Sequence, residues 1–364
     1  MGAASHNYQS QKLMKRSNAL CGNGIRLPFF SVIIPMYNVG GRVRDCLQSV
    51  YMQDVAEDEL EVIVVNDNST DDSVIHASEA AKCHPNTTII NHKENKRPGG
   101  ARNTALHIAK GEYVVFLDAD DYWRYTNTLS TLKRLIEATG ADVIDNNVNT
   151  YVDYDSVLSP QRYESAVDYK KITREELLGS EDFQLGPWNA AYRRDTILEH
   201  GVWFGEFVQY EDVDWRMRIV YWAGSIVRVS FPYYCYRKNP KSILNNPSPR
   251  LMYDAVACYK RLYAFALGDI NQEMKRYLCT WIVNNVTSFP MLSRIYPLSE
   301  SRKAVMALAE SGLLSRRSYL SLCSGFMASR RQVISLWILK CMPRLLLLPY
   351  RMAMLGKNII RRRR

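Results

Sequence analysis

Three of the four residues 118–121 are aspartates, and they directly follow a short apolar run. Tyr113–Leu117 is rich in β-branched and aromatic residues and predicts a buried strand, which Asp118, Asp120 and Asp121 follow directly. Ligands of open α/β sheets bind beyond the carboxyl ends of the strands, so a crevice is expected here. Clustered carboxylates repel one another unless a cation neutralises them, and oxygen ligands suit Mg²⁺ or Mn²⁺. The alternative is a solvated acidic turn.

Two more polar groups follow predicted strands in the same way. Tyr37 and Asn38 come after the apolar run 29–34, and Asp67 comes after the run 61–65. Because the carboxyl ends of parallel strands share one edge of a sheet, we expect all of these residues along one rim.

A second acidic pair lies far along the chain. Val213, Met217, Val220 and Tyr221 recur at helical spacing, which puts Glu211 and Asp212 at the N-terminus of that helix. The helix dipole favours the charged form of a carboxylate there, which suits a general base or a metal contact. An ordinary pair of capping residues is the alternative. Asp214 is a competing acid, turned about 200° away by helical geometry.

The elements that must position these residues alternate between strands and helices. Strands are expected at 29–34, 61–65, 88–91, 113–117 and 142–145, with helices between them. This alternation predicts an α/β fold with a mostly parallel sheet and helices on both faces. No Gly-x-Gly-x-x-Gly follows the first strand and no Gly-Lys-Ser/Thr loop occurs, so dinucleotide and Walker-type sites are disfavoured.

Apolar residues make up 47% of the 364-residue chain, as in ordinary globular proteins, and the net charge is +10. Residues 311–364 hold twelve Lys and Arg and no Asp or Glu, so the rest of the chain is nearly neutral. The eight cysteines show no metal-binding spacing and are expected as reduced thiols. Residues 1–28 lack an apolar segment, which predicts a flexible arm and no secretory signal.

The last part of the chain interleaves basic and apolar residues. Trp337 and Leu345–Leu348 are apolar, but Lys340, Pro343 and Arg344 interrupt the run, which makes a membrane-spanning helix unfavourable. We expect residues 330–364 to form an amphipathic tail on an anionic membrane surface, at its cytoplasmic face. A helical cap with a solvated basic tip is one alternative. Nucleic-acid binding is another, and the apolar residues between the charges disfavour it.

Four blocks of sequence, in order, carry a resemblance to a known family. They are Ser31–Asn38, Val64–Asp71, Gly100–Asn103 and Phe116–Asp121. These blocks resemble the inverting nucleotide-sugar glycosyltransferases of family two, which have the GT-A (Rossmann-like) fold. Later segments resemble the acceptor half of bacterial members that build surface polysaccharides; these are Pro187–Asn189, Glu211–Asp212 and Tyr236–Ile243. The resemblance covers about residues 30–245.

This resemblance implies a role for each matching residue. The nucleotide of a donor, expected to be a UDP-sugar, would be bound by Pro35, Tyr37, Asn38, Asp67, Arg97, Arg102 and Asp118. Within this set Asp67 would hydrogen-bond the base and Asp118 would meet the ribose or the metal. A Mn²⁺ or Mg²⁺ ion would be held by Asp120, with Asp118. Asp212 would be the general base, with Glu211 beside it. A lid over the diphosphate would contain Tyr236, Arg237 and Ser242.

The predicted organisation follows from the same resemblance. A GT-A domain spans 29–245, with a nucleotide half at 29–147 and an acceptor half at 148–245, and a helical region follows at 246–329. The expected acceptor is a saccharide or a lipid-linked saccharide. The sequence departs from the family at Asn66 and Asn68, where Asp and Gly are more frequent. Four aromatic residues could stack on an acceptor sugar, although core packing is favoured for them: Trp188, Trp203, Phe204 and Tyr210.

Two other functions remain open at this point. A sugar-phosphate nucleotidyltransferase would share the sheet and the metal carboxylates. It would need a basic, Gly-rich loop after the first strand, and residues 35–41 match such a loop poorly. An inactive membrane-bound scaffold is the other alternative, and the joint presence of Asp67, Asp120 and Asp212 argues against it.

Overall fold

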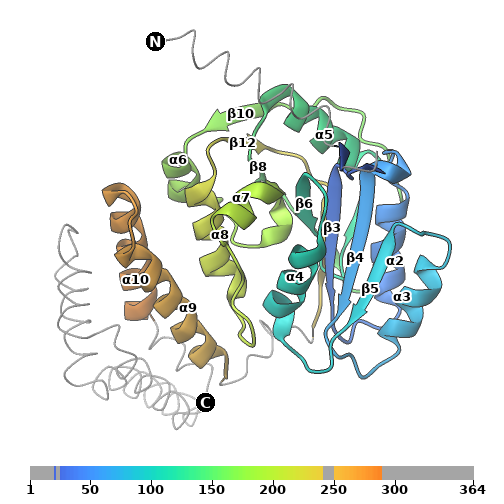
Figure 1. The fold of residues 1–364 in the computed structure, drawn as a ribbon, viewed down its shortest axis with the longest axis horizontal. Coiled ribbons are helices and arrows are strands. Elements are labelled where there is room, and N and C mark those ends of the chain that lie inside the picture. The colour runs from blue at the N-terminus through green and yellow to red at the C-terminus, as the bar shows by residue number, and fades with distance from the viewer. Residues whose placement is uncertain (1–19, 22–24, 241–249, 289–364) are drawn as a thin grey trace, which may run out of the picture. The chain divides into compact units, whose positions relative to one another are not determined.

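The computed structural model describes residues 20–21, 25–240 and 250–288 (Figure 1). Its largest element is an eight-stranded sheet in the order β10-β12-β8-β11-β6-β3-β4-β5. In chain order these strands are β3 (Phe30–Met36), β4 (Leu60–Asn66), β5 (Thr87–Asn91), β6 (Tyr113–Phe116), β8 (Val143–Asn146), β10 (Tyr169–Ile172), β11 (Ala190–Arg193) and β12 (Ile226–Val229). Ser242, the tail 330–364 and most of the predicted arm lie outside the described residues.

The strands that carry the predicted site are all parallel. β3 pairs with β4 and with β6, and β4 pairs with β5, each in parallel register. Their β-branched residues are buried on both faces, as expected for a parallel sheet covered by helices. The five strands predicted from the sequence are all present, and the carboxyl ends of β3, β4 and β6 lie at one edge.

The other half of the sheet is mixed. β11 pairs antiparallel with both β6 and β8, and β10 pairs antiparallel with β12, while β8 and β12 are parallel. The α/β fold with flanking helices is confirmed. The antiparallel insertion of β11 was not predicted, because a four-residue strand leaves little periodic signal.

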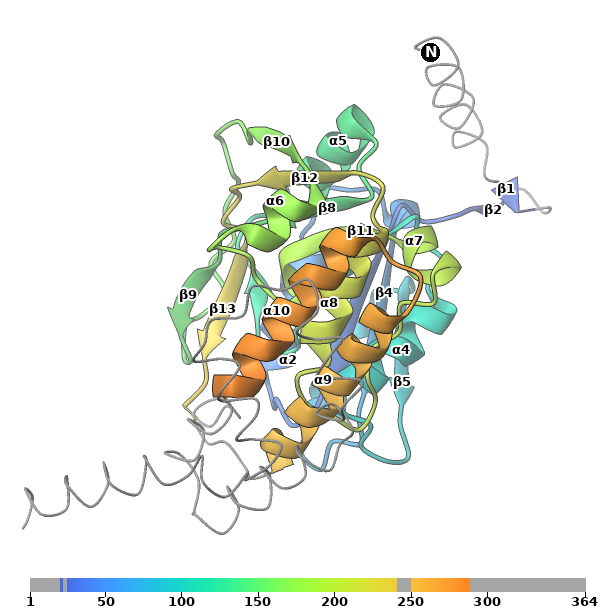
Figure 2. The same cartoon turned by 90° about the vertical axis from the view of Figure 1, so that its left-hand side faces the viewer.

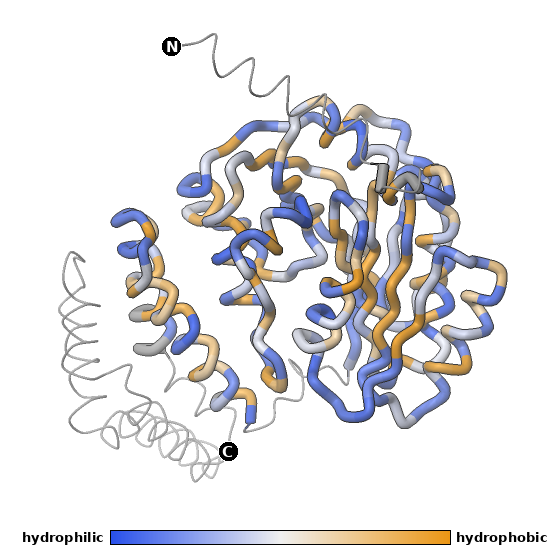
Figure 3. Tube along the Cα trace, in the orientation of Figure 1, coloured by the Kyte–Doolittle hydropathy of each residue, from blue (hydrophilic) through white to orange (hydrophobic). Residues whose placement is uncertain are grey.

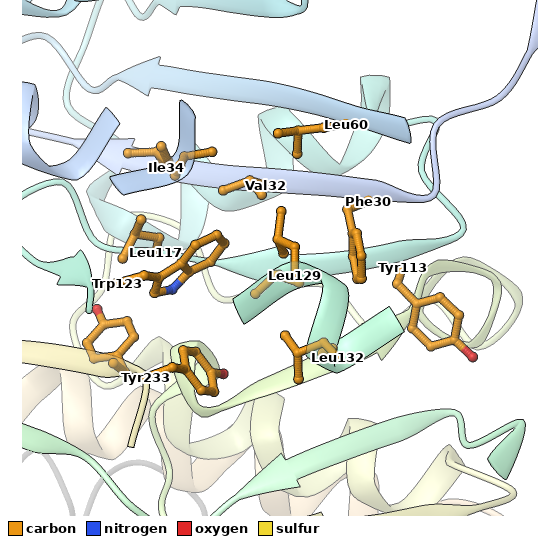
Figure 4. Packing of buried hydrophobic residues seen from close by; sticks show 14 of the residues in the cluster. Phe30, Val32, Ile34, Leu60, Tyr113, Leu117, Trp123, Leu129, Leu132 and Tyr233 are labelled. Atoms are coloured by element: carbon orange, nitrogen blue, oxygen red, sulfur yellow. The ribbon is translucent and has the colours of Figure 1, made fainter. Parts of the chain in front are cut away.

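Helices cover both faces of the sheet. Alternate residues of β3 point to the face covered by α2 (Arg42–Tyr51), α3 (Ser73–Ala81) and α5 (Thr128–Thr139). Figure 4 shows Val32 and Ile34 of β3 on the side of Leu129 and Leu132 of α5. The other face of β3 and β4 packs against α4 (Arg97–Ile108). In Figure 3 the central strands form the most apolar part of the trace.

A smaller sheet lies beside the end of β6. Its strands, in the order β7-β13-β9, are β7 (Tyr122–Trp123), β13 (Tyr234–Lys238) and β9 (Thr150–Asp153). β7 follows the three carboxylates directly, so its antiparallel pairing with β13 brings Tyr234 and Arg237 to them.

The remaining short elements connect these parts. They are the hairpin β1 (Leu20–Cys21) and β2 (Ile25–Arg26), the 3₁₀ turns η1 (Glu57–Glu59) and η2 (Pro187–Asn189), and the helices α6 (Arg174–Gly179) and α7 (Arg194–Glu199). The segment 150–180 contains β9, β10 and α6.

The chain divides into two compact units, each described by itself. The first unit contains the eight-stranded sheet and the three-stranded sheet. The second contains Phe204–Tyr221 and the described residues after Arg237. The helices of the second unit are α8 (Glu211–Trp222), α9 (Arg250–Leu267) and α10 (Gln272–Ser288), and α9 packs on α10 (Figure 2). The predicted domain boundaries stay predictions. None of the described helices is both long and apolar enough to span a bilayer.

Candidate active site

Asp118 stands at the end of β6 and is already partly neutralised. One of its oxygens, Oδ1, accepts a hydrogen bond from Arg102 Nη2 at 2.8 Å, while the side chain stays 24% exposed. Arg102 comes from α4 and is buried. The fold thus brings Arg102 to Asp118 from sixteen residues away in the sequence.

Asp120 has the electrostatics of a cation ligand. Burial, and then the neighbouring charge of Asp118, raise the pKa of its carboxyl from 3.8 to about 6, with Arg237 and Arg42 acting in the opposite direction. A divalent cation would reverse this cost by compensating both carboxylates. No cluster of three or more Asp, Glu, His or Cys residues forms a metal site in the described part of the chain. The oxygen atoms of Asp118 and Asp120 would suit Mg²⁺ or Mn²⁺, held by one or two carboxylates plus phosphate oxygens of a substrate.

Asp121 has a different task. It is buried, its Oδ2 accepts a hydrogen bond from Tyr234 Oη at 2.7 Å, and its Oδ1 accepts one from the Arg237 backbone N–H at 2.8 Å. Burial, then the charges of Asp120 and Asp118, raise the pKa of Asp121 well above its ordinary value. Asp121 therefore ties the carboxylate loop to β13.

Arg237 completes this anchor. Its buried guanidinium donates to the backbone oxygens of Asp120 (2.9 Å) and Ser156 (3.0 Å) and forms an ion pair with Asp45 of α2. These contacts hold the loop to β13 and α2. The lid contact of Arg237 with the diphosphate stays a prediction. The neighbouring Tyr236 is half-buried against Trp188.

The loop after β3 is held by hydrogen bonds to the segment that follows β4. Asn38 has a left-handed backbone (φ 50°), and its Oδ1 accepts a hydrogen bond from the Thr70 N–H at 2.8 Å. The backbone N–H groups of Val39 and Gly40 both donate to Ser73 Oγ at 2.9 Å. Pro35 lies within β3, and Tyr37 is 46% exposed at this edge, as a residue that borders a nucleoside would be.

Asp67 is buried at the end of β4, and its two oxygens differ. Oδ1 accepts hydrogen bonds from His92 Nδ1 and from the Lys96 backbone N–H, both at 2.8 Å. Oδ2 is buried and has no hydrogen-bond partner among the described residues. Because a buried acceptor without a partner costs free energy, Oδ2 is the atom that a ligand would satisfy.

The two departures from the family pattern have structural reasons. Asn68 has a left-handed backbone (φ 62°), which Asn tolerates better than most residues other than Gly. Asn66 Nδ2 donates to Asn91 Oδ1 at 2.9 Å, and Asn66 Oδ1 accepts from the Ser69 N–H at 3.0 Å.

Of the two predicted nucleotide arginines, only Arg97 has a side chain near solvent. Arg97 opens α4 with φ 68° and is partly exposed, and its N–H donates to Asn95 Oδ1 at 3.2 Å. Arg102 is buried and forms an ion pair with Asp118. A residue other than glycine with a strained, left-handed backbone at the N-terminus of a helix is typical of a functional position.

The predicted catalytic pair opens α8 in the second unit, as expected. Glu211 is buried, whereas Asp212 is partly exposed and its Oδ1 accepts from the Val213 N–H at 2.9 Å. Asp214 is fully buried between Arg218 and Arg261, so the competing acid serves as a structural counter-ion.

Two left-handed residues precede α8: Phe207 (φ 61°) and Tyr210 (φ 63°). The backbone between them is held to α9, because the Gln209 N–H donates to Asp254 Oδ2 at 3.1 Å and Arg250 Nη2 donates to Phe207 O at 2.8 Å.

The four aromatic residues considered for acceptor stacking are all engaged with neighbours or partly buried. Phe204 is buried and stacks on Trp215, with ring centroids 4.3 Å apart. Trp203 stacks on His107 at 4.5 Å. Trp188 contacts Tyr234 and Tyr236. Tyr210 is partly buried, and burial is the main cause that raises its pKa.

Several residues of this site were not predicted from the sequence. His92, Asp45 and Tyr234 lie 25, 192 and 113 residues from the groups they contact. His92 follows β5, the neighbour of β4, at the same edge of the sheet. The rule that placed Asp67 at this edge could therefore also have found His92.

The fold is shared with a solved glycosyltransferase. S. aureus TarS 1–349, determined in complex with UDP-GlcNAc, superposes with a TM-score of 0.68 and 22% identity, over 89% of this chain and 92% of that one. The sheet, its carboxylate edge and this likeness define a GT-A fold.

Sequence comparison gives the family. Residues 31–201 match the family described as Glycosyl transferase family 2. The Bacillus subtilis (strain 168) protein EpsH, named as a glycosyltransferase, is 30% identical over 292 residues, which cover 79% of this chain and 83% of that protein. The chain belongs to glycosyltransferase family 2. Poly(ribitol-phosphate) beta-glucosyltransferase of Bacillus spizizenii is 40% identical over 93 residues, which are 25% of this chain and 15% of that enzyme.

Proposed function

We propose that this glycosyltransferase transfers a sugar from a UDP-sugar to a saccharide or lipid-linked saccharide, with inversion, in the synthesis of a surface polysaccharide. The observation that carries the proposal is the edge formed by β3, β4 and β6. This edge contains Asp67 Oδ2, a hydrogen-bond acceptor that could bind a nucleobase. It also contains the carboxylates of Asp118 and Asp120, which could bind the metal ion of a metal-bound diphosphate. The acceptor class is supported by the relative named for poly(ribitol-phosphate).

The donor would be held at three points along this edge. Tyr37 and Asn38 would border the nucleoside, and Asp67 Oδ2 would accept the N3–H of uracil. Arg97, with its partly exposed side chain, is the candidate cation for the diphosphate. A Mn²⁺ or Mg²⁺ ion held by Asp120 and Asp118 would stabilise the charge of the departing nucleoside diphosphate.

Asp212 would act on the acceptor. Its partly exposed carboxylate at the start of α8 would accept the proton of the attacking hydroxyl, which then displaces UDP from the opposite face of the sugar. A single displacement of this kind inverts the anomeric centre. Asp214 cannot share this role, because two arginines occupy its oxygens.

The tail would bring the enzyme to its acceptor. Residues 330–364 interleave basic and apolar side chains, and each basic residue contributes about 1 kcal/mol near an anionic membrane surface. Peripheral binding at the cytoplasmic face would confine the enzyme and a lipid-linked acceptor to one layer.

A panel of nucleoside diphosphates tests the proposal. UDP with Mn²⁺ should raise the melting temperature of the full chain, because a ligand at 100 times its dissociation constant stabilises by about 2.7 kcal/mol. CDP should have little effect, and chelator should reduce the shift by UDP. Equal shifts by UDP and CDP would refute the base assignment, and a chelator-independent shift by UDP would refute the metal.

A further inference from the structure

The hydrogen bonds around Asp67 have a fixed direction. The Lys96 N–H is a backbone group and can only donate to Oδ1. His92 Nδ1 faces the same carboxylate oxygen, so this nitrogen carries the proton whenever Asp67 is ionised.

His92 is itself held in place. Its Nε2 lies 2.9 Å from Thr104 Oγ1 of α4, a hydroxyl that can donate or accept. The side chains of His92 and Asp67 are 8% and 3% exposed, so water has little access to their pair. The imidazole therefore stays between β4 and α4 with its Nδ1–H directed at Asp67.

We propose that His92 and the Lys96 N–H form a polarity clamp that determines which nucleobase the enzyme accepts. Both donors act on Oδ1, which leaves Oδ2 as a buried atom that can only accept. Such an atom pairs with the N3–H of uracil. It rejects cytosine, whose N3 presents a lone pair instead of a hydrogen. His92 is thus a specificity-determining residue that acts through Asp67, and this inference rests on the proposed nucleotide site.

The clamp makes an unusual prediction for Asp67→Asn. The Asn carbonyl oxygen must take the position of Oδ1, because the Lys96 N–H and His92 both donate there. The Asn NH₂ group then occupies the position of Oδ2 and presents a donor. The substitution should therefore reverse the base preference as well as weaken UDP binding.

The dissociation constants of UDP and CDP, measured by calorimetry with Mg²⁺ on the full chain, provide the test. We expect the wild type to prefer UDP by 100-fold or more, since a site built for one hydrogen-bond pattern strongly rejects the opposite pattern. Asp67→Asn should bind CDP more tightly than UDP.

Substitutions of His92 test its share in the clamp. His92→Leu should reduce the UDP preference of the wild type by about tenfold, since one of two hydrogen bonds to a charged group is lost. His92→Asn, whose NH₂ can replace the Nδ1–H, should recover much of the preference. His84 stacks on Tyr51 and offers a matched control, because His84→Leu should leave the preference unchanged.

The outcomes separate this inference from the proposed function. A wild type without a UDP preference would refute the uracil site itself. Two results with Asp67→Asn would overturn the clamp alone, provided that the wild type prefers UDP. In the first, the variant still prefers UDP. In the second, it binds neither nucleotide although its melting temperature is unchanged. An unchanged preference in His92→Leu would remove His92 from it.

Discussion

Asp214 and Arg261 form a buried ion pair that joins α8 to α9. Asp214 Oδ1 accepts from Arg261 Nε at 2.9 Å and from Nη2 at 2.6 Å, and Asp214 is fully buried. The Cβ of any residue replacing Gly205 would lie 2.5 Å from Arg261 Cζ, so glycine allows this arginine to approach. Asp212, two residues before Asp214, therefore lies in the first turn of a helix whose position depends on α9.

Asp212→Asn should lower turnover by about 10²–10⁴, the usual contribution of a positioned general base. UDP affinity should be unchanged, because Asp212 is assigned to the acceptor. Steady-state kinetics and UDP calorimetry measure the two effects. The control is Asp214→Asn, which should mainly lower the melting temperature. A normally stable Asp214→Asn variant with the greater loss of turnover would show that the wrong acid of α8 was assigned as base.

Arg261→Ala should destabilise the chain by roughly 1–3 kcal/mol, because the buried carboxylate of Asp214 loses one hydrogen-bond partner and keeps the other, Arg218. Arg218→Ala removes the partner of Asp214 that lies on α8 itself, and is the matched control. Only Arg261→Ala breaks the tie between the helices, so only this variant should also reduce turnover at temperatures well below its melting point. Equal turnover of the two variants would mean that α9 does not position the base.

Asp120→Asn should abolish transfer and make UDP binding independent of Mn²⁺. The reason is the loss of the carboxylate assigned to the ion on the diphosphate. UDP titrations in Mn²⁺ and in chelator measure this directly, with Asp71→Asn in the loop before α3 as an acidic control. Normal activity of Asp120→Asn in excess chelator would contradict the metal site.

Without metal, Asp120 should lower stability as the pH rises. Its pKa is about 6 in the folded chain and near 3.8 when unfolded, so the folded state binds more protons between these values. The contribution of Asp120 to the free energy of unfolding should therefore decline from about pH 4 to about pH 6, and stay low above that. Melting temperatures in chelator, compared between wild type and Asp120→Asn, should diverge over this range, with the variant more stable at pH 7. Parallel curves would refute the raised pKa.

Removal of residues 330–364 should abolish flotation with anionic liposomes and leave UDP binding intact. Binding of the full chain should weaken toward 1 M salt, where the screening length falls to about 3 Å, and its apolar part should persist. Neutral liposomes are the control for charge. Equal flotation of full-length and truncated chains, or none by either, would assign the tail a structural role.

The strands of the parallel half and the residues that end them could be predicted because both signals are local. Runs such as Val62–Val65 are read directly from the sequence, and parallel strands bring their ends together without further information. The start of α8 at Glu211 was predicted in the same way, from helical spacing.

What the sequence did not reveal depends on pairs of residues far apart in the chain. β11 enters the sheet antiparallel through only four residues, and β7 has only two. The contacts of Arg237 with Asp45 and Ser156 are likewise set by tertiary structure. Periodicity carries no information on such partners, so these contacts become visible only in the three-dimensional structure.

The anchoring of Asp121 by β13 has a consequence for the synthesis of the chain. Tyr234 and the Arg237 N–H lie 113 and 116 residues after the carboxylate that they hold. When residues 31–201, the part matched by the family, have left the ribosome, every residue proposed to bind the donor has been synthesised. Tyr234 and Arg237, which hold Asp121, have not. Contacts this distant in sequence form late, because their loop closure must precede any gain in contact energy. The nascent enzyme should therefore acquire its donor site only after β13 emerges, as a last step of folding.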